Sequence, residues 1–348
     1  MNSLAHCGNT ERASTATVNL IMKTAARIGF NLQPVLADAG LGYLSTRGFD
    51  PHLLPPPVAQ FVPVYSALIA ACCMGGGGER RLPAKADVEL FCGCLLNCAN
   101  LGAALERAMR FNEIANRRWG EICLASGDRE AAWTMDAYRR NGSAADMTLD
   151  IFCLSFFHRL FSWLMAIPLV VQRVELSYPA LLDAAVVEAV FGAPVRFGVR
   201  RNALILKSES LAMPVVRSYG DLAAALASTP VALLPLPPAI AFAAHIEMIL
   251  QRSAETGMAL PNFDEVAALL GQSVSTLRRK LLRENSSFQA VVDRWRTKRA
   301  TELLHDADMT LDAIAAHLGF SGPAVFSRAF KHWTGSAPSA YRRTLRKH

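Results

Sequence analysis

Apolar residues recur with a helical period along the first third of the chain, and three stretches carry the pattern most clearly. They run from Val18 to Ile28, from Val58 to Cys73 and from Leu101 to Ile114. Residues three and four apart share one side of an α-helix, so each stretch is expected to bury one face. The first 115 residues are therefore predicted to be mainly helical.

A period of two replaces the helical period after residue 120 and predicts strands. Residues 121–124 and 131–135 flank a Ser-Gly-Asp turn, which indicates an antiparallel hairpin. A further strand is expected over 170–178, and a second hairpin from 195–197 and 203–206. The N-terminal region is thus predicted to be α+β, with helices and an antiparallel sheet.

One apolar stretch, Ile151–Val171, is long enough to span a bilayer. It carries His158 and Arg159 near its middle and Pro168 near its end, and charge at that depth is costly in lipid. We therefore predict a buried helix that runs into a strand, and no membrane association. The N-terminus also lacks the basic start and apolar run of a secretion signal, so we expect a cytoplasmic protein.

Prolines divide the chain. Four of them lie between Thr229 and Pro238. Proline has no backbone N–H and disfavours helix in the residue before it, so neither a helix nor a central strand is expected to cross this segment. We predict a linker over residues 229–238, between a first domain of residues 1–228 and a second of residues 239–348.

Two segments of the second domain resemble each other: Phe263–Leu281 and Leu311–Phe330. They align at an offset of 48 up to a turn and 49 beyond it. Each copy has an Ala-Ala pair that lets another helix cross closely, a glycine suited to a positive φ at a helix end, a serine that can cap the next helix, and two apolar residues four apart. These features are Ala267-Ala268 and Ala315-Ala316, Gly271 and Gly319, Ser273 and Ser321, and Leu277/Leu281 and Phe326/Phe330.

This spacing is typical of the helix-turn-helix, whose second helix enters the major groove of DNA. An amphipathic helix is expected between the copies over Ser287–His305, with Phe288, Val292, Trp295 and Leu303 available to both cores. Its 19 residues would span about 28 Å, against about 34 Å between successive major grooves on one DNA face. We therefore expect one chain to cover a site of about 15–20 base pairs with an all-α double helix-turn-helix.

Charge supports a polyanionic partner for this domain. Residues 239–348 hold 15 Lys and Arg against 10 Asp and Glu, so they carry most of the net charge of +7. The chain has none of the sequence motifs G-x-S-x-G, H-E-x-x-H or G-x-G-x-x-G, so we expect no enzyme and no cofactor.

Five of the eight cysteines lie close together in the sequence: Cys72, Cys73, Cys92, Cys94 and Cys98. They could form a metal or thiol sensor, but their spacing lacks the paired C-x2-C of structural zinc sites. Cys94 and Cys98 would also share a helical face with Leu90, Leu95 and Leu101. We therefore expect core cysteines and no metal site.

The second domain resembles the AraC/XylS family of bacterial regulators over residues 263–343. The resemblance rests on A-x-x-x-G-x-S-x-x-x-L-x-R-x-L in the first copy, R-x-x-x-A-x-x-L-L in the connecting helix, and I-A-x-x-x-G-F-S, F-S-R-A-F-K and P-x-x-Y-R in the second. The first domain resembles the arabinose-binding-type effector domain of one branch of the family, through residues 101–111, 188–198 and 211–214. The resemblance implies a sequence-specific transcription factor whose first domain binds a small molecule and dimerises.

The predicted DNA contacts divide into two groups. Residues on the outward faces of the two recognition helices, over about 275–284 and 323–333, are expected to read bases, with arginine best suited to guanine: Ser275, Thr276, Arg278, Arg279, Pro323, Ala324, Ser327 and Arg328. Other cations are expected to contact phosphates: Lys280, Arg283, Arg296, Lys298, Lys331 and Arg342. The first helix is expected to carry most base reading, because Pro323 and Ala324 offer only apolar contact.

The effector is unknown from the sequence. Arg117, Arg118 and Trp119 could meet an anionic ligand, or could be a solvated basic turn. Two other functions stay open: an enzyme tethered to DNA, and a DNA-binding protein whose first domain only assembles it. The expected partners are double-stranded DNA in the nucleoid, a small-molecule effector, a second copy of the chain and, for an activator, RNA polymerase.

Overall fold

The computed structural model describes residues 12–44, 54–74, 83–117, 119–136, 142–226, 241–306 and 308–345. The chain divides into two compact units, Met1–Pro238 and Ala239–His348. The predicted linker over residues 229–238 lies outside the described residues.

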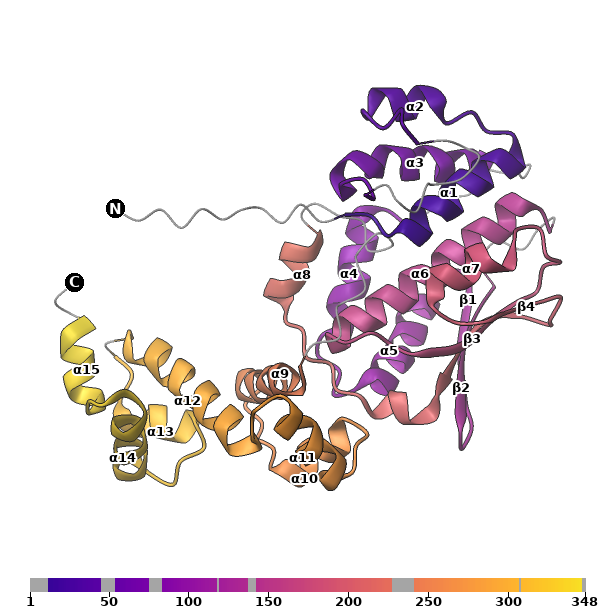
Figure 1. Cartoon of the computed structure of the whole chain (residues 1–348). Helices are drawn as coiled ribbons and strands as arrows, with labels where there is room; N and C mark the ends of the chain where they lie inside the picture. Colours follow the sequence, from indigo (N-terminus) through magenta and orange to yellow (C-terminus); the bar gives the residue numbers. More distant parts are fainter. Residues whose placement is uncertain are drawn as a thin grey trace. The chain divides into compact units, whose positions relative to one another are not determined.

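The N-terminal unit combines helices with one five-stranded sheet (Figure 1). Its helices are α1 (Thr15–Ile28), α2 (Gln33–Asp38), α3 (Val58–Met74), α4 (Lys85–Leu95), α5 (Leu101–Ile114), α6 (Ala144–Met165), α7 (Ala184–Phe191), α8 (Tyr219–Leu226) and a 3-10 helix over Ser208–Ala212. Its strands are β1 (Glu121–Ser126), β2 (Glu130–Asp136), β3 (Val171–Leu176), β4 (Val195–Phe197) and β5 (Asn202–Lys207). The three expected helices and the α+β class are confirmed.

The strand order is β1-β2-β5-β3-β4. The first predicted hairpin is confirmed, with β1 antiparallel to β2. The second is wrong: β4 pairs in parallel with β3, and β5 lies between β2 and β3. The sheet is therefore mixed. Helix α7 connects β3 to β4 as a crossover, which makes those strands parallel. The first five residues of β5 are buried, so β5 occupies the centre, while β4 is a three-residue edge strand.

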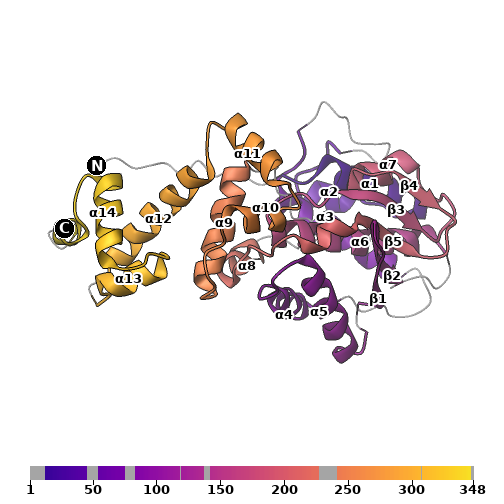
Figure 2. The same ribbon diagram turned by 90° about the horizontal axis from the view of Figure 1, so that it is seen from below.

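Helix α6 is the middle layer of the unit and packs against α1 and α3 as well as β2 and β5 (Figures 1 and 2). It is the helix expected from the apolar stretch, and it is buried along nearly its whole length, including His158 and Arg159. In the part of the chain that the structure describes, no helix combines the length and hydropathy required to cross a membrane.

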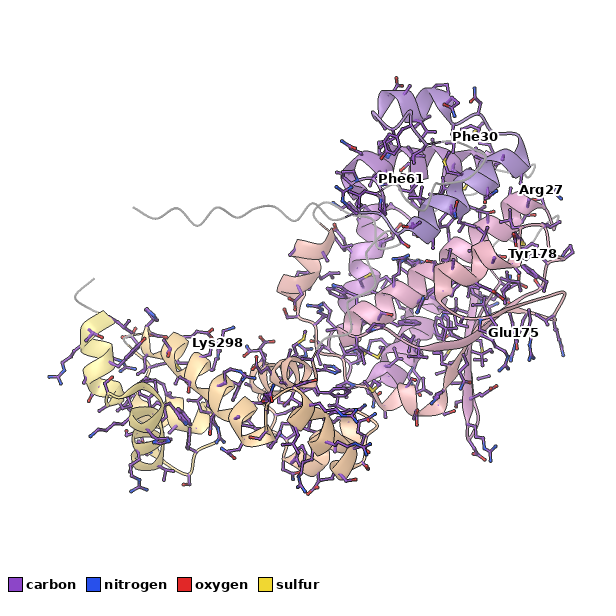
Figure 3. The ribbon with its side chains drawn as sticks, in the orientation of Figure 1. Arg27, Phe30, Phe61, Glu175, Tyr178 and Lys298 are labelled. Atoms are coloured by element: carbon purple, nitrogen blue, oxygen red, sulfur yellow. The ribbon has the colours of Figure 1, made fainter. Side chains whose placement is uncertain are left out.

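A buried polar network ties α6 to the sheet. Tyr178 donates to Asp150 Oδ2 at 2.5 Å, and Asn202 Nδ2 donates to the same oxygen at 2.9 Å. Asn202 Oδ1 accepts from the backbone N–H and the hydroxyl of Ser177. Burial and the neighbouring Asp150 carboxylate raise the pKa of Tyr178, which keeps its hydroxyl a donor. The network thereby fixes α6 against the sheet (Tyr178 is labelled in Figure 3).

Burial lowers the pKa of His158 to about 4, and its Nδ1 has no hydrogen-bond partner. Its Nε2 lies 2.8 Å from the Leu169 carbonyl oxygen. The unfolded chain therefore binds more protons than the folded one below pH about 6.5, and stability should fall as the pH drops toward 4. For this one group the loss approaches about 3 kcal/mol.

The measurement is urea unfolding of the full chain at several pH values. H158Q should remove this part of the pH dependence, whereas H305Q, at an exposed histidine of the other unit, should leave it unchanged. An identical pH profile for H158Q and the natural chain would contradict the assignment.

The cysteine cluster differs from its prediction in two respects. Helix α4 ends at Leu95, so Cys98 lies beyond it and does not share a helical face with Cys94. Leu90, expected in the core, is 63% exposed. Burial raises the pKa of Cys92 to about 12, which makes its thiol unreactive. The described residues contain no group of three or more His, Cys, Asp or Glu side chains placed to hold a metal ion.

The C-terminal unit is all helical and contains α9 (Phe242–Glu255), α10 (Phe263–Leu269), α11 (Val274–Arg283), α12 (Phe288–Leu304), α13 (Leu311–His317), α14 (Pro323–Thr334) and α15 (Pro338–Leu345). Figures 1 and 2 show α12 running from the α10–α11 pair to the α13–α14 pair. These two pairs are the predicted helix-turn-helix motifs.

Candidate DNA-binding face

Local signals build the first motif, α10–α11. Asn262 and Glu265 form a capping box at the start of α10. Gly271 has a φ of 59°, which allows the sharp turn after that helix. The Ser273 side chain then accepts the backbone N–H of Thr276 and caps α11, as expected. Leu277 and Leu281 are buried, so the opposite face of α11 is turned to solvent.

The second motif, α13–α14, repeats this plan with one difference at the cap. Gly319 has the expected positive φ, 71°, and Phe326 and Phe330 are buried. However, Gly322 is the N-cap of α14 and makes no side-chain bond, so the prediction for Ser321 is wrong. The extra residue of the second copy lies before the cap. The offset of 49 therefore already applies there and pairs Gly322 with Ser273.

Only one alanine of each Ala-Ala pair is packed in the core. Ala267 and Ala315 are buried, whereas Ala268 and Ala316 are exposed. The first alanine of each pair therefore allows the close helix crossing, and the second does not.

Helix α12 is the connecting helix that the sequence predicts, and Ser287 caps its N-terminus. Of the four residues expected to reach the cores, Val292 and Trp295 are buried, and Phe288 is half-buried beside the Phe263 ring. The fourth, Leu303, is half-buried, and its neighbour Leu304 is buried in its stead.

The outward face of α11 carries most of its predicted base readers. Ser275, Arg278 and Arg279 are exposed. Thr276 is half-buried, and its hydroxyl oxygen accepts a hydrogen bond from the Ser273 hydroxyl at 2.8 Å. The Arg278 guanidinium lies 5.7 Å from the Phe263 ring centroid, toward the start of α10. Helical spacing places Arg279 nearest the centre of the outward face, with Ser275 one turn before it and Arg283 one turn after it.

Sequence reasoning missed Leu282 on this face. Its side chain is 64% exposed, although leucine is apolar. The signal was available: Leu282 lies three residues after Arg279 and seven after Ser275, so helical periodicity turns it outward. Its neighbour Leu281 supplies the core contact of this turn of the helix.

The outward face of α14 can be aligned with that of α11 position by position, and the two faces share one arginine. At the offset of 49, Arg328 corresponds to Arg279, Ala324 to Ser275 and Lys331 to Leu282. Arg328, Ala324 and Lys331 are exposed, and the other two predicted base readers, Pro323 and Ser327, are half-buried. Each motif thus has an exposed arginine at the same position of its second helix. In α11 a polar residue precedes this arginine by four positions and an apolar residue follows it by three, whereas in α14 the apolar residue precedes and the polar residue follows.

Three of the cations predicted to contact phosphate are free to do so: Arg283, Lys298 and Lys331 are exposed (Lys298 is labelled on α12 in Figure 3). The other three are half-buried and bonded within the protein. Lys280 Nζ donates to Gln272 Oε1 at 2.8 Å and lies 4.2 Å from the Phe242 ring centroid.

Arg296 and Arg342 bind backbone carbonyls. Arg296 Nε donates to the Leu318 oxygen at 3.0 Å, and Arg342 Nη2 donates to the Met309 oxygen at 2.7 Å. Desolvation by burial lowers the pKa of Arg296. Both arginines therefore have a packing partner in the protein before any DNA is bound.

The N-terminal basic turn offers little to a ligand within the described residues. Arg117 forms an ion pair with Glu121 at 2.6 Å, and Trp119 is buried and stacked on Phe91. Arg118 lies outside the described residues. Trp119 is thus a core residue, and Arg117 is paired with Glu121 at the surface.

These units define the class of protein: a DNA-binding regulator with a separate N-terminal domain. The model of the arabinose-binding domain of AraC transcription regulators matches residues 29–215, and a helix-turn-helix domain model matches residues 266–344. The chain belongs to the AraC-type transcription regulators that carry this N-terminal domain. Its matched domains are those of a DNA-binding transcriptional regulator.

Curated relatives agree with this assignment. An uncharacterised HTH-type transcriptional regulator of Mycobacterium tuberculosis is 40% identical over 83 residues, or 24% of each chain. The chain therefore spans only about a quarter of the length of such relatives. The ornithine utilization regulator of Pseudomonas aeruginosa is 27% identical over 255 residues, or 71% of this chain and 72% of the relative. Among solved structures, the transcriptional regulator CdpR of Pseudomonas aeruginosa aligns with 90% of this chain and 96% of its own, at 20% identity and a TM-score of 0.34.

Proposed function

We propose that the chain is a sequence-specific transcription factor whose helices α11 and α14 enter successive major grooves of one DNA site. The supporting observation is the match between the two outward faces, each with an arginine opposite its buried apolar pair. Arginine bidentate to guanine is the commonest specific contact in the major groove. Helix α12 has 17 residues and is about 26 Å long, which suits motifs placed about one helical turn of DNA apart.

The base contacts follow from exposure. Ser275, Arg278, Arg279 and Arg328 are the polar readers in this proposal, with Thr276 and Ser327 at the border of the interface. Ala324, Pro323 and Leu282 offer apolar contact, which suits the methyl group of thymine. Arg283, Lys298 and Lys331 contact phosphates. Lys280, Arg296 and Arg342 support the fold of the motifs in place of the phosphate contacts expected from sequence.

The N-terminal domain, residues 1–228, binds a small-molecule effector and carries the dimer contact in this proposal, and residues 229–238 link it to the DNA-binding domain. The family match over residues 29–215 supports the effector role. The relative named for ornithine utilization makes ornithine and other amino acids the first compounds to test. A ligand present at 100 times its Kd would stabilise the domain by about 2.7 kcal/mol in a thermal-shift measurement. The protein acts in the cytoplasm at the nucleoid and, if it activates, contacts RNA polymerase.

Selection of binding sites from random DNA by the full chain tests the central claim. We expect a site with two half-sites about one helical turn apart, at least one of them containing guanine. R278A should relax the preference at one base pair and cost about 1–3 kcal/mol. K331A should weaken binding to all sequences alike and reduce the salt dependence.

Two results would contradict the proposal. The first is the absence of any preferred sequence. The second is an equal loss of affinity in R278A and K331A for selected and random DNA, since the division into base and phosphate contacts would then be wrong.

A further inference from the structure

The two helix-turn-helix turns differ in what surrounds their glycines. A Cβ atom on Gly271 would meet nothing within 4 Å. A Cβ atom on Gly319 would lie 3.2 Å from Leu260 Cδ1 and 3.5 Å from Arg296 Nη2. The second turn is therefore closely covered by side chains from outside its own motif, whereas the first is open.

The residues that cover the second turn come from outside the α13–α14 motif. Leu260 lies between α9 and α10, and Arg296 lies in the middle of α12. In the views of Figures 1 and 2 the α13–α14 pair meets the rest of the unit through α12, so Leu260 adds a second route between the motifs. We call the set of Leu260, Arg296, Leu318, Gly319 and Phe320 the joint.

Arg296 makes three contacts in the joint. Its Nε donates to the carbonyl of Leu318, the last residue before the turn, and its Nη2 lies 3.5 Å from the Gly319 oxygen. Its guanidinium stacks 4.5 Å from the Phe320 ring centroid. A cation that caps the negative end of α13 and stacks on the next aromatic ring holds that turn in one orientation.

Orientation matters because a rigid pair of reading helices fits only one arrangement of half-sites. Each base pair inserted between half-sites moves the second by about 3.4 Å along the axis and turns it by about 35°. Helix α12 packs against α13 and α14, and the joint adds contacts that oppose a tilt of this pair relative to the first motif.

We propose that Arg296 is a positioning residue which, together with Leu260, fixes the second reading helix relative to the first and so sets the spacing of half-sites that the protein accepts. The proposal rests on the proposed function, because it requires both helices to contact DNA. It assigns Arg296 to spacing selectivity and not to the phosphate contact expected from sequence.

The test uses the full chain and the selected site rebuilt with two fewer to two more base pairs between its half-sites. The natural chain should lose about tenfold or more in affinity for each one-base-pair change, since both helices must stay in their grooves. R296Q and L260A should flatten this profile to about threefold or less, while affinity for a single half-site changes less than about twofold. R294Q, at an exposed arginine of the same helix that has no part in the proposed DNA contacts, is the matched control and should keep the sharp profile.

The outcomes separate the alternatives. An unchanged spacing profile in folded R296Q and L260A overturns the proposal. So does a uniform loss of affinity in R296Q with a smaller salt dependence, because that result makes Arg296 a phosphate contact. If R296Q fails to fold by circular dichroism, the profile of L260A decides. Absence of any preferred site for the natural chain is a different result, because it contradicts the proposed function itself.

Discussion

Alanine at Arg279 is expected to reduce affinity for the selected DNA site by about 1–3 kcal/mol, or about 5- to 150-fold, while affinity for random DNA falls much less. Arg279 is exposed near the centre of the outward face of α11, opposite the buried Leu277 and Leu281. A guanidinium there can form two hydrogen bonds to guanine that no other base accepts in the same geometry. The measurement is a titration of both DNAs at fixed salt, since affinity depends strongly on salt.

The matched control lies one helical turn further along. Arg283 has the same charge and is also exposed. R283A should weaken binding to selected and random DNA by similar factors and lower the salt slope by about one. If R279A and R283A changed the ratio of specific to random affinity equally, the assignment of Arg279 as a base reader would fail.

Alanine at Asp150 is expected to lower the free energy of unfolding of the N-terminal unit by about 3–5 kcal/mol, a large share of the stability of most domains. Asp150 is fully buried and accepts hydrogen bonds from Tyr178 and Asn202. Without it, a hydroxyl and an amide in the interior lose their acceptor, and each such group costs about 1–3 kcal/mol. Urea unfolding of the full chain, followed through its first transition, measures the loss.

Asp183 provides the comparison for this substitution. It is an exposed aspartate in the same unit, and its side chain caps α7 by accepting the N–H of Ala185. D183A should cost only about 1 kcal/mol, the usual value for a lost cap. If D150A lowered the free energy of unfolding by less than D183A does, the network would not hold α6 to the sheet.

Exposure in the structure changes the balance expected between α11 and α14. The sequence favoured α11 as the main reader, because Pro323 and Ala324 are apolar. Leu282 adds an apolar residue to α11, and its counterpart Lys331 is charged. The outward faces of α11 and α14 therefore differ less in polarity than Pro323 and Ala324 alone suggest. Their common feature is the arginine at the same position, Arg279 in α11 and Arg328 in α14.

The sequence predicts the individual helices and strands of the N-terminal unit but not the order in which the strands pair. Strands β1 and β2 are joined by three residues, so their pairing is a local decision that turn chemistry settles. Strands β4 and β5 are also close in sequence, but β5 pairs with β2 and β3. That choice depends on burial of β5 on both faces, which alternation within one short stretch does not encode.

By itself, the sequence determined the double helix-turn-helix and the two-unit organisation around it. Capping residues, glycines at positive φ and apolar pairs four apart act within one or two turns of the chain, so their spacing records the local structure directly. Only the tertiary structure decided the sheet order, the exposure of Leu282 and the partners of Lys280, Arg296 and Arg342. Those outcomes depend on contacts such as Arg296 with Leu318, between residues far apart in the chain, which leave no periodic trace in the sequence.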